Sequence, residues 1–220
     1  LQFRFAGADT EGRVFFSEGY ETLVADDFPA IVESDFEQNN AGWSVQGDAS
    51  AAFQGRWMRG FPIEAVGAPT GDFDGSGRCY VTGNGGDICC DVDEMTILLS
   101  PRLDATGGEA FLSYARWFSN DRGPWPGQDV LTVEISNDDG DTWSLLEEVG
   151  PSGPETSGGW YLSTFRVEDF VTPTESVRVR FIANDPTTDS IIEAAIDRFA
   201  LEVVICNDDV PGDLDGDGVV

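Results

Sequence analysis

The sequence predicts an all-β protein built from two packed antiparallel sheets. Three observations lead to this fold class. Short runs rich in β-branched and aromatic residues alternate with segments of Gly, Asn, Asp and Pro. No ten-residue window shows a capped apolar stripe with helical spacing, so we expect few helices. In the run VRVRFIA, the apolar residues Val177, Val179 and Phe181 alternate with arginines, which is typical of a strand with one face in water.

The expected strands are spaced along most of the chain. They are residues 57–59, 79–82, 95–99, 111–118, 130–136, 143–149, 160–167, 177–183 and 194–205. A chain of 220 residues is long enough to bury one full core, and β-sandwiches of roughly 200–250 residues often form a single domain. We therefore expect one main domain with short appendages.

We predict an N-terminal extension at 1–34, the main domain at 35–206 and a C-terminal tail at 207–220, where Pro211-Gly212 indicates a boundary. In the extension, the runs LQFRF and RVFF are strand-like. They are consistent with an extra strand or hairpin packed on the sandwich. Alternatively, a strand of this extension adds to the open sheet edge of a neighbouring copy.

The charge balance excludes several classes of function. The chain has 41 acidic and 12 basic residues, all of them Arg, with a formal net charge of −29. Such a charge opposes binding to nucleic acid and anionic membranes and favours divalent cations. The absence of His and Lys removes Ser-His-Asp triads, His-containing zinc sites and Schiff-base chemistry. No apolar stretch reaches the roughly 18 residues needed for membrane insertion.

Four cysteines, Cys79, Cys89, Cys90 and Cys206, lack the CxxC spacing of metal sites. An even number in a Gly-rich, acidic chain predicts an oxidising compartment, secretion and two disulfides. A bond between the adjacent Cys89 and Cys90 would be strained, so we expect Cys79 to pair with one of them and Cys206 with the other. Free buried thiols are the alternative.

The stretch SNDDGDTW, residues 136–143, matches the Asp-box pattern of sialidases. It occurs once, without the repeat of roughly 40–50 residues that a propeller needs. Asp139-Gly140 between two strand-like runs instead predicts a hairpin turn. We expect Asp138 to accept hydrogen bonds from the turn and Trp143 to enter the core.

Several motifs in order resemble a known family. DFEQNNAGWSVQ at 35–46 is similar to the opening of MAM domains, and EAAIDRFAL at 193–201 with Cys206 resembles their closing strand and terminal Cys. GDFDGSGRCYVTG, LSYARWFSN and DVLTVEISNDDGDTW follow the order of MAM-like modules, which resemble the cleaved-adhesin domains of gingipain-type proteins. The resemblance covers roughly 35–206. It implies a calcium-bound jelly-roll β-sandwich used for adhesion or substrate attachment, without catalysis.

The acidic motifs suggest where calcium binds. Ca²⁺ prefers about 6–8 oxygen ligands, and the spaced pair Asp72 and Asp74 in GDFDGSG can supply two carboxylates from one turn. The resemblance adds Glu37 and Asp197, so that one ion would join the first and last strands. Asp93 is a weaker candidate. Ser76 replaces an acidic residue of cleaved-adhesin domains, which predicts weaker binding.

A second calcium motif lies at the C-terminus. Asp213, Asp215 and Asp217 in GDLDGDGVV fit positions 1, 3 and 5 of an EF-hand loop. The motif resembles the first half of a dockerin repeat or a calcium-binding linker. The acidic residue of position 12 would lie beyond Val220, so we expect this chain to be part of a longer protein.

Two functional classes remain. The first is an attachment module for carbohydrate or protein, in which an exposed aromatic platform is drawn from Trp57, Trp117, Trp125 or Trp160; Trp125, between two prolines, is the preferred ligand-binding residue. The second is a self-associating subunit of a cell-surface assembly. An enzyme is disfavoured, because no carboxylate pair stands out from the acidic background.

Overall fold

The computed structural model describes residues 2–3, 6–8, 14–16, 20–21, 30–47, 55–84, 91–186 and 190–204. The chain divides into two units: Leu1–Phe28 with Val204–Val220, and Pro29–Val203. The boundary predicted from the sequence lies after residue 34. The compact unit begins earlier because the strand Ala30–Ser34 pairs with a strand of the sandwich. Within the described ranges, no helix has the length and apolar character of a membrane span.

The first unit contains two short antiparallel pairs. Strand β1 (Gln2–Phe3) pairs with β4 (Tyr20–Glu21), and β2 (Ala6–Ala8) pairs with β3 (Val14–Phe16). The strand-like runs LQFRF and RVFF overlap β1 and β3. The described strands of this unit therefore pair with one another.

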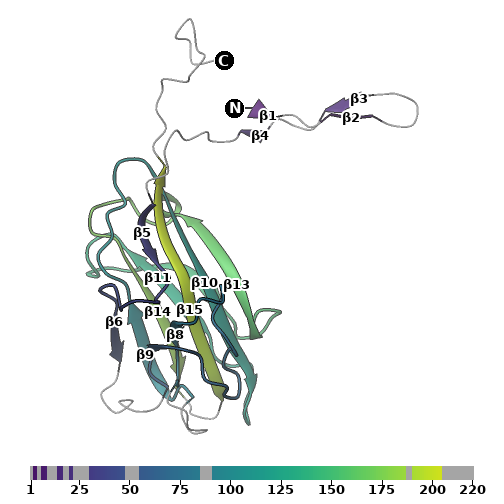
Figure 1. Ribbon diagram of the computed structural model, residues 1–220, viewed down its shortest axis with the longest axis vertical. Helices are drawn as coiled ribbons and strands as arrows, with labels where there is room; N and C mark the ends of the chain where they lie inside the picture. Colours follow the sequence, from purple (N-terminus) through teal and green to yellow (C-terminus); the bar gives the residue numbers. More distant parts are fainter. Residues whose placement is uncertain are drawn as a thin grey trace, which may run out of the picture. The chain divides into compact units, whose positions relative to one another are not determined.

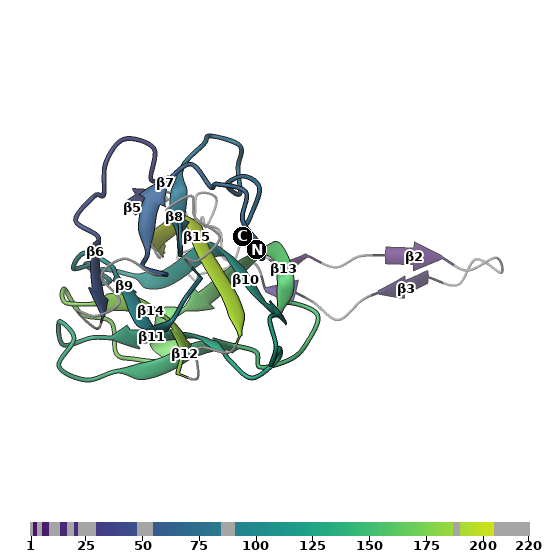
Figure 2. The same ribbon diagram turned by 90° about the horizontal axis from the view of Figure 1, so that it is seen from below.

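The second unit is a sandwich of two antiparallel sheets, which face each other in Figures 1 and 2. The first sheet has the order β13-β10-β15-β8-β7, and β5 also pairs with β15. Its strands are β5 (Ala30–Ser34), β7 (Met58–Gly60), β8 (Cys79–Val81), β10 (Glu109–Arg122), β13 (Ser157–Arg166) and β15 (Ile191–Val204). The all-β, two-sheet jelly-roll prediction is confirmed.

The second sheet has the order β12-β11-β14-β9-β6. Its strands are β6 (Ser44–Gly47), β9 (Glu94–Leu99), β11 (Leu131–Ser136), β12 (Ser144–Val149) and β14 (Arg178–Asp185). Every strand predicted between residues 57 and 205 overlaps an observed one. Two strands were not predicted: β5, which lies within the predicted N-terminal extension, and β6, a short and mostly exposed edge strand.

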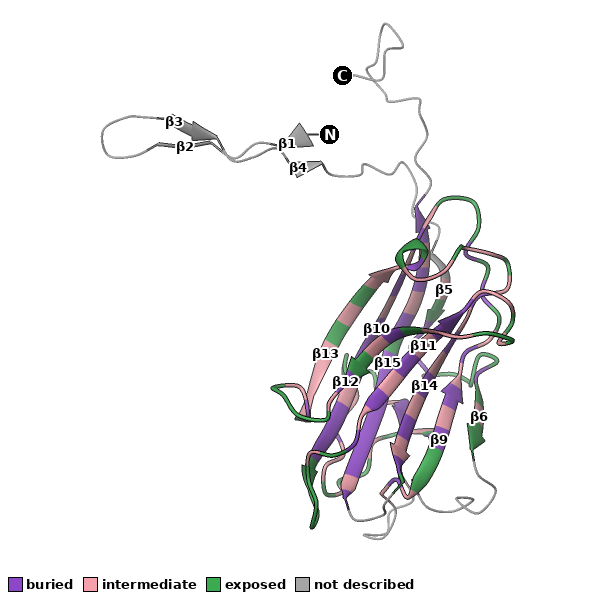
Figure 3. Ribbon diagram, turned by 180° about the vertical axis from the view of Figure 1, so that it is seen from behind, coloured by how far each residue is buried: buried purple, intermediate pink, exposed green. Residues whose placement is uncertain are grey.

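Alternating burial along the strands builds the core between the sheets (Figure 3). In β14, Val179, Phe181 and Ala183 are fully buried, while the alternate positions, Arg178, Arg180 and Ile182, are half-buried. Trp43 lies at the centre of an aromatic cluster. Its ring centroid is 5.4 Å from Phe36, 6.2 Å from Tyr80, 6.1 Å from Phe181 and 4.8 Å from Phe199.

The Asp-box is a hairpin turn between β11 and β12, as predicted. The carboxylate of Asp138 accepts hydrogen bonds from the Thr142 amide (2.8 Å) and hydroxyl (2.6 Å). Asp139 and Gly140 have φ of 62° and 100°, the left-handed conformation that favours this dipeptide. The expectation that Trp143 enters the core was wrong. Trp143 is half-buried on the outer face, where the Arg180 guanidinium lies 4.2 Å from its ring centroid.

Candidate metal centre and ligand surfaces

The loop at 61–78, between β7 and β8, folds over the outer face of the first sheet. Two tryptophans of that face hold it: the Trp117 indole donates to the Gly67 carbonyl (2.8 Å), and the Trp160 indole donates to the Gly71 carbonyl (3.1 Å). Phe73 packs edge-on against Trp160 at 6.1 Å. These contacts place the acidic turn of the loop directly over β15.

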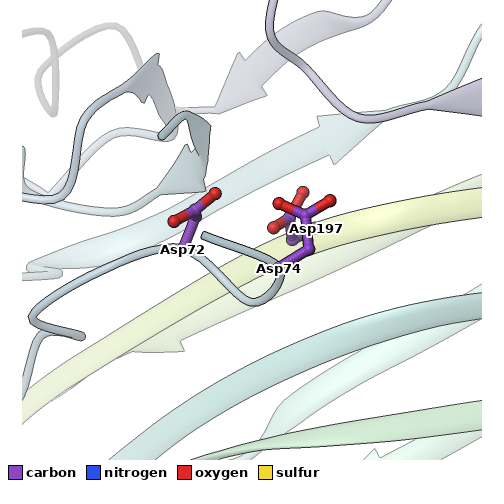
Figure 4. A group of neighbouring side chains, drawn as sticks. All are labelled: Asp72, Asp74 and Asp197. Carbon is purple, nitrogen blue, oxygen red and sulfur yellow. The ribbon is translucent and has the colours of Figure 1, made fainter. Parts of the chain in front are cut away.

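Three aspartates meet at this place (Figure 4). Asp72 and Asp74 come from the loop and Asp197 from β15, and one carboxylate oxygen of each lies within 4.8 Å of those of the other two. We call this group the aspartate trio. Asp197 is fully buried. The structure therefore brings together three of the residues that the sequence analysis selected as calcium ligands.

A tight turn shapes the loop half of the trio. Asp72 Oδ2 accepts hydrogen bonds from the Gly77 amide (2.6 Å) and the Ser76 hydroxyl (3.1 Å), and Asp74 Oδ1 accepts one from the Ser76 amide (2.9 Å). Gly77 has φ of 134°, and a Cβ there would lie 2.6 Å from the Phe61 ring. Glycine at this position lets the turn close around the carboxylates.

Glu37 borders the trio without belonging to it. Its Oε1 accepts hydrogen bonds from the Arg78 amide and from the Ser76 hydroxyl (3.3 Å), and its Oε2 lies 3.7 Å from the Arg78 guanidinium. The Ser76 hydroxyl therefore links Glu37 to Asp72. Asp93 lies elsewhere, next to the start of β9, and is not part of the trio.

The electrostatics of the trio favour a cation. Burial, together with the charges of Asp74 and Asp72, raises the pKa of Asp197 to about 6, although hydrogen bonds from the Phe73 and Arg198 amides oppose this rise. For Asp74, hydrogen bonds from Ser76 outweigh burial and lower the pKa. The Arg198 guanidinium lies 3.4 Å from Asp74. A buried carboxyl beside ionised ones is a place where Ca²⁺ would relieve repulsion.

Several predicted site residues lie outside the described residues. They are the terminal aspartates Asp213, Asp215 and Asp217 and the cysteines Cys89, Cys90 and Cys206. Cys79 is buried in β8. The second calcium motif and both disulfides therefore stay predictions.

Of the four tryptophans considered as an aromatic platform, only Trp125 is exposed, at 58% of its surface. Trp57 is 2% exposed, so its place in a platform was wrong, and Trp117 and Trp160 are half-buried beneath the loop at 61–78. The Ser190 hydroxyl donates to the Trp125 carbonyl (2.8 Å), and the Gly127 amide donates to the Asn120 carbonyl (2.8 Å). These two hydrogen bonds hold the base of the loop around Trp125, while the indole is exposed to solvent.

A groove of about 350 Å³ on the outer face of the first sheet was not expected. It adjoins the trio through Phe73 and Arg198. Its walls combine apolar, acidic and basic side chains: Glu33, Ser34, Asp35, Phe73, Ser113, Leu162, Arg198, Phe199, Ala200 and Glu202. Because these residues come from β5, β10, β13, β15 and nearby loops, no local sequence pattern identifies them together.

Glu193 is another buried acid on β15, and it was not among the candidate residues predicted from the sequence. It is 2% exposed and accepts a hydrogen bond from the Thr82 hydroxyl, which in turn accepts one from the Ala194 amide (2.9 Å). Burial raises the pKa of Glu193 to about 8 from an ordinary value of 4.5; the Thr82 hydrogen bond lowers it, and the charge of Asp91 raises it. The carboxyl is thus neutral in the folded protein below this pH.

We expect Glu193→Gln to flatten the pH dependence of stability. A carboxyl with a raised pKa in the folded state contributes stability that is present below pH 4.5 and is lost as the pH rises towards about 8. The loss amounts to roughly 1.4 kcal/mol per pH unit. A glutamine keeps the acceptor for Thr82 without the charge, so Glu193→Gln should be more stable than wild type at pH 8 and similar at pH 5. Urea denaturation at both pH values measures the free energy of unfolding. If this free energy changes equally between pH 5 and pH 8 in the two proteins, the prediction is contradicted.

Comparisons with solved structures agree with the jelly-roll β-sandwich class. The K1 cleaved adhesin domain of Lys-gingipain from Porphyromonas gingivalis W83 aligns with a TM-score of 0.50 and 15% identity, over 78% of this chain and 97% of that domain. The K3 domain gives 0.47 and 16%, over 80% and 99%. The CBM22-1 xylan-binding domain of Paenibacillus barcinonensis Xyn10C gives 0.45 and 12%, over 84% and 100%. At such identities the likeness shows the fold alone. No protein-family model and no curated protein sequence matches the chain.

Proposed function

We propose that this chain is a secreted, calcium-stabilised, non-catalytic β-sandwich module that attaches to a carbohydrate or protein ligand. The observation that carries the calcium part is the aspartate trio, in which the fully buried Asp197 shares a site with Asp72 and Asp74. Among the described residues, no ion pair includes Asp197. A bound cation would neutralise this carboxylate and join the loop at 61–78 to β15.

The donor set fits Ca²⁺. Carboxylate oxygens are hard ligands, and calcium accepts irregular arrangements that waters and backbone carbonyls complete. Asp72, Asp74 and Asp197 would hold the ion, with Glu37 at the edge through Ser76. The ion would supply charge neutralisation and a crosslink between distant parts of the chain. No reaction step is assigned to it.

Two surfaces are available for a ligand. Trp125 presents an indole to solvent on a fastened loop, and a rigid exposed aromatic can stack on a sugar ring or anchor a protein contact. The groove beside the trio offers Phe73 and Leu162, which are 38% and 62% exposed. Adhesin and carbohydrate-binding domains among the similar structures support a binding role. We assign the ligand contact to Trp125.

Binding to carbohydrate and protein arrays by the purified, calcium-loaded chain tests this assignment. We expect Trp125→Ala to weaken ligand binding about tenfold or more, as loss of a binding hot spot does. Leu145→Ala is the matched control, because Leu145 is similarly exposed, at 56%, on β12. If Leu162→Ala weakens binding and Trp125→Ala does not, the ligand occupies the groove and the assignment to Trp125 is wrong. Hydrolysis of a bound glycan or peptide would refute the non-catalytic role.

Self-association through N-terminal strand addition stays a prediction, and we keep it as the alternative function. Sedimentation of the full chain over a range of concentrations, with and without residues 1–20, measures it directly.

A further inference from the structure

A second group of acids lies at one end of the sandwich, where β14 ends and β9 and β11 begin (Figure 3, lower end). In the β11–β14 pair, Leu131 lies opposite Ala183. Continuing that register by two residues places Asp129 opposite Asp185, and on the other side of β14, Asp185 pairs with Glu94. Acidic residues thus occupy neighbouring positions at the start of β9, at the end of β14 and just before β11.

Both aspartates point inward. Their positions continue the buried alternation of Leu131 and Val133 in β11 and of Phe181 and Ala183 in β14. Asp185 is fully buried, and Asp129 is 6% exposed. Like charges directly opposite each other in a sheet are destabilising, and burial increases the cost of each charge.

Asp129 has an orphaned oxygen. Its Oδ2 is buried without a hydrogen-bond partner among the described residues, and leaving a buried charged acceptor unsatisfied is costly. The backbone of Asp129 is nonetheless held in place, because the buried Asn120 side chain donates to its carbonyl at 2.6 Å. The carboxylate is therefore positioned by its surroundings, with one oxygen left for a ligand.

Three acids at this end of the sandwich have no ion-pair partner among the described residues. None of the ion pairs within the described ranges includes Asp91, Asp93 or Asp129. For all three, burial raises the pKa and the charge of Asp185 adds to the rise, while a hydrogen bond with Ser190 partly offsets it for Asp129. Mutual repulsion of this kind is relieved by a bound cation.

We propose that Asp129 and Asp185 hold a second divalent cation, of the hard type that Ca²⁺ represents, at this end of the sandwich. Asp91 and Asp93 add negative charge around it. The ion satisfies the orphaned Asp129 oxygen, and it is independent of the aspartate trio. Ser190 connects it to the ligand surface, since the Ser190 amide donates to Asp185 (3.1 Å) and its hydroxyl donates to the Trp125 carbonyl (2.8 Å). Occupancy therefore stiffens the base of the Trp125 loop.

Native mass spectrometry with Ca²⁺ alone tests the site by counting ions per chain. We expect Asp129→Asn to bind one ion fewer than wild type, Asp197→Asn to bind one fewer, and the double variant to bind two fewer. Asp121→Asn is the matched control, an exposed aspartate near the same loop whose ion pair is with the adjacent Arg122, and it should keep the wild-type count. The two single variants separate failure of this proposal from failure of the trio site.

Thermal melting gives a second readout that packing damage would not reproduce. In EDTA, Asp129→Asn should melt above wild type because repulsion with Asp185 is removed, whereas in Ca²⁺ it should melt below wild type because the ion is lost. An unchanged ion count with a wild-type calcium response overturns the proposal. If Asp129→Asn does not fold, Asp185→Asn decides by the same count, since its amide oxygen still accepts from Ser190. An Asp197→Asn protein that binds no Ca²⁺ at about tenfold molar excess over chain also overturns it.

Discussion

Removal of calcium with EDTA is expected to lower the melting temperature of the wild-type chain by about 5–10 °C. A cation that binds only the folded state stabilises it by roughly 2.7 kcal/mol at a hundredfold excess over Kd, and a chain of this size shifts by roughly 2–4 °C per kcal/mol. Ca²⁺ should restore the melting temperature better than Mg²⁺, which demands a tighter octahedron. Differential scanning calorimetry measures both effects.

The trio provides the variant and its control. Asp197→Asn removes the buried charge at nearly constant volume, so the calcium-dependent shift should shrink and the metal-free protein should not lose stability. Asp141→Asn removes an exposed charge in the β11–β12 turn and should keep the full shift. A full wild-type response in Asp197→Asn would show that the trio is not the site, and no response to EDTA in wild type would refute calcium stabilisation altogether.

Trp43→Ala is expected to destabilise the fold by about 3–5 kcal/mol, the range for a large aromatic removed from a core. Trp43 is 2% exposed and contacts aromatic side chains of both sheets, such as Tyr80 and Phe181. Its indole also donates to the Ser34 hydroxyl (3.2 Å), which ties β5 to the core. The variant therefore leaves a cavity and removes a buried hydrogen bond.

Trp125→Ala is the matched control, because the same side chain is removed from a site that is 58% exposed. Its free energy of unfolding should stay within about 0.5 kcal/mol of wild type, as for most surface substitutions. Urea denaturation in Ca²⁺ measures both variants. Comparable losses in the two proteins would contradict the burial assigned to these tryptophans.

The strands of the sandwich were predictable because alternation with period two is a local property. The run from Val177 to Phe181 shows its buried and half-exposed faces in the sequence itself. The edge strands β5 and β6 were missed because an edge strand carries little apolar alternation to mark it. The exposure of the tryptophans was predicted only in part: Trp125 is exposed as expected, but Trp57 is buried. An indole is compatible with the core and with the surface, so the surrounding tertiary structure determines which of the two it occupies.

In the candidate sites, too, some features were predictable from the local sequence and others only from the tertiary structure. The spacing of Asp72 and Asp74 in one turn is visible in the sequence, and Asp197 was selected only through a family resemblance. By itself the sequence determined the strands, the Asp-box turn and the excess of carboxylates, all of which depend on near neighbours. The tertiary structure decided which carboxylates meet. Asp74 and Asp197 are far apart in the chain, and Asp129 faces Asp185 only in the β11–β14 register, where a shift of one residue would turn the side chains to the opposite face.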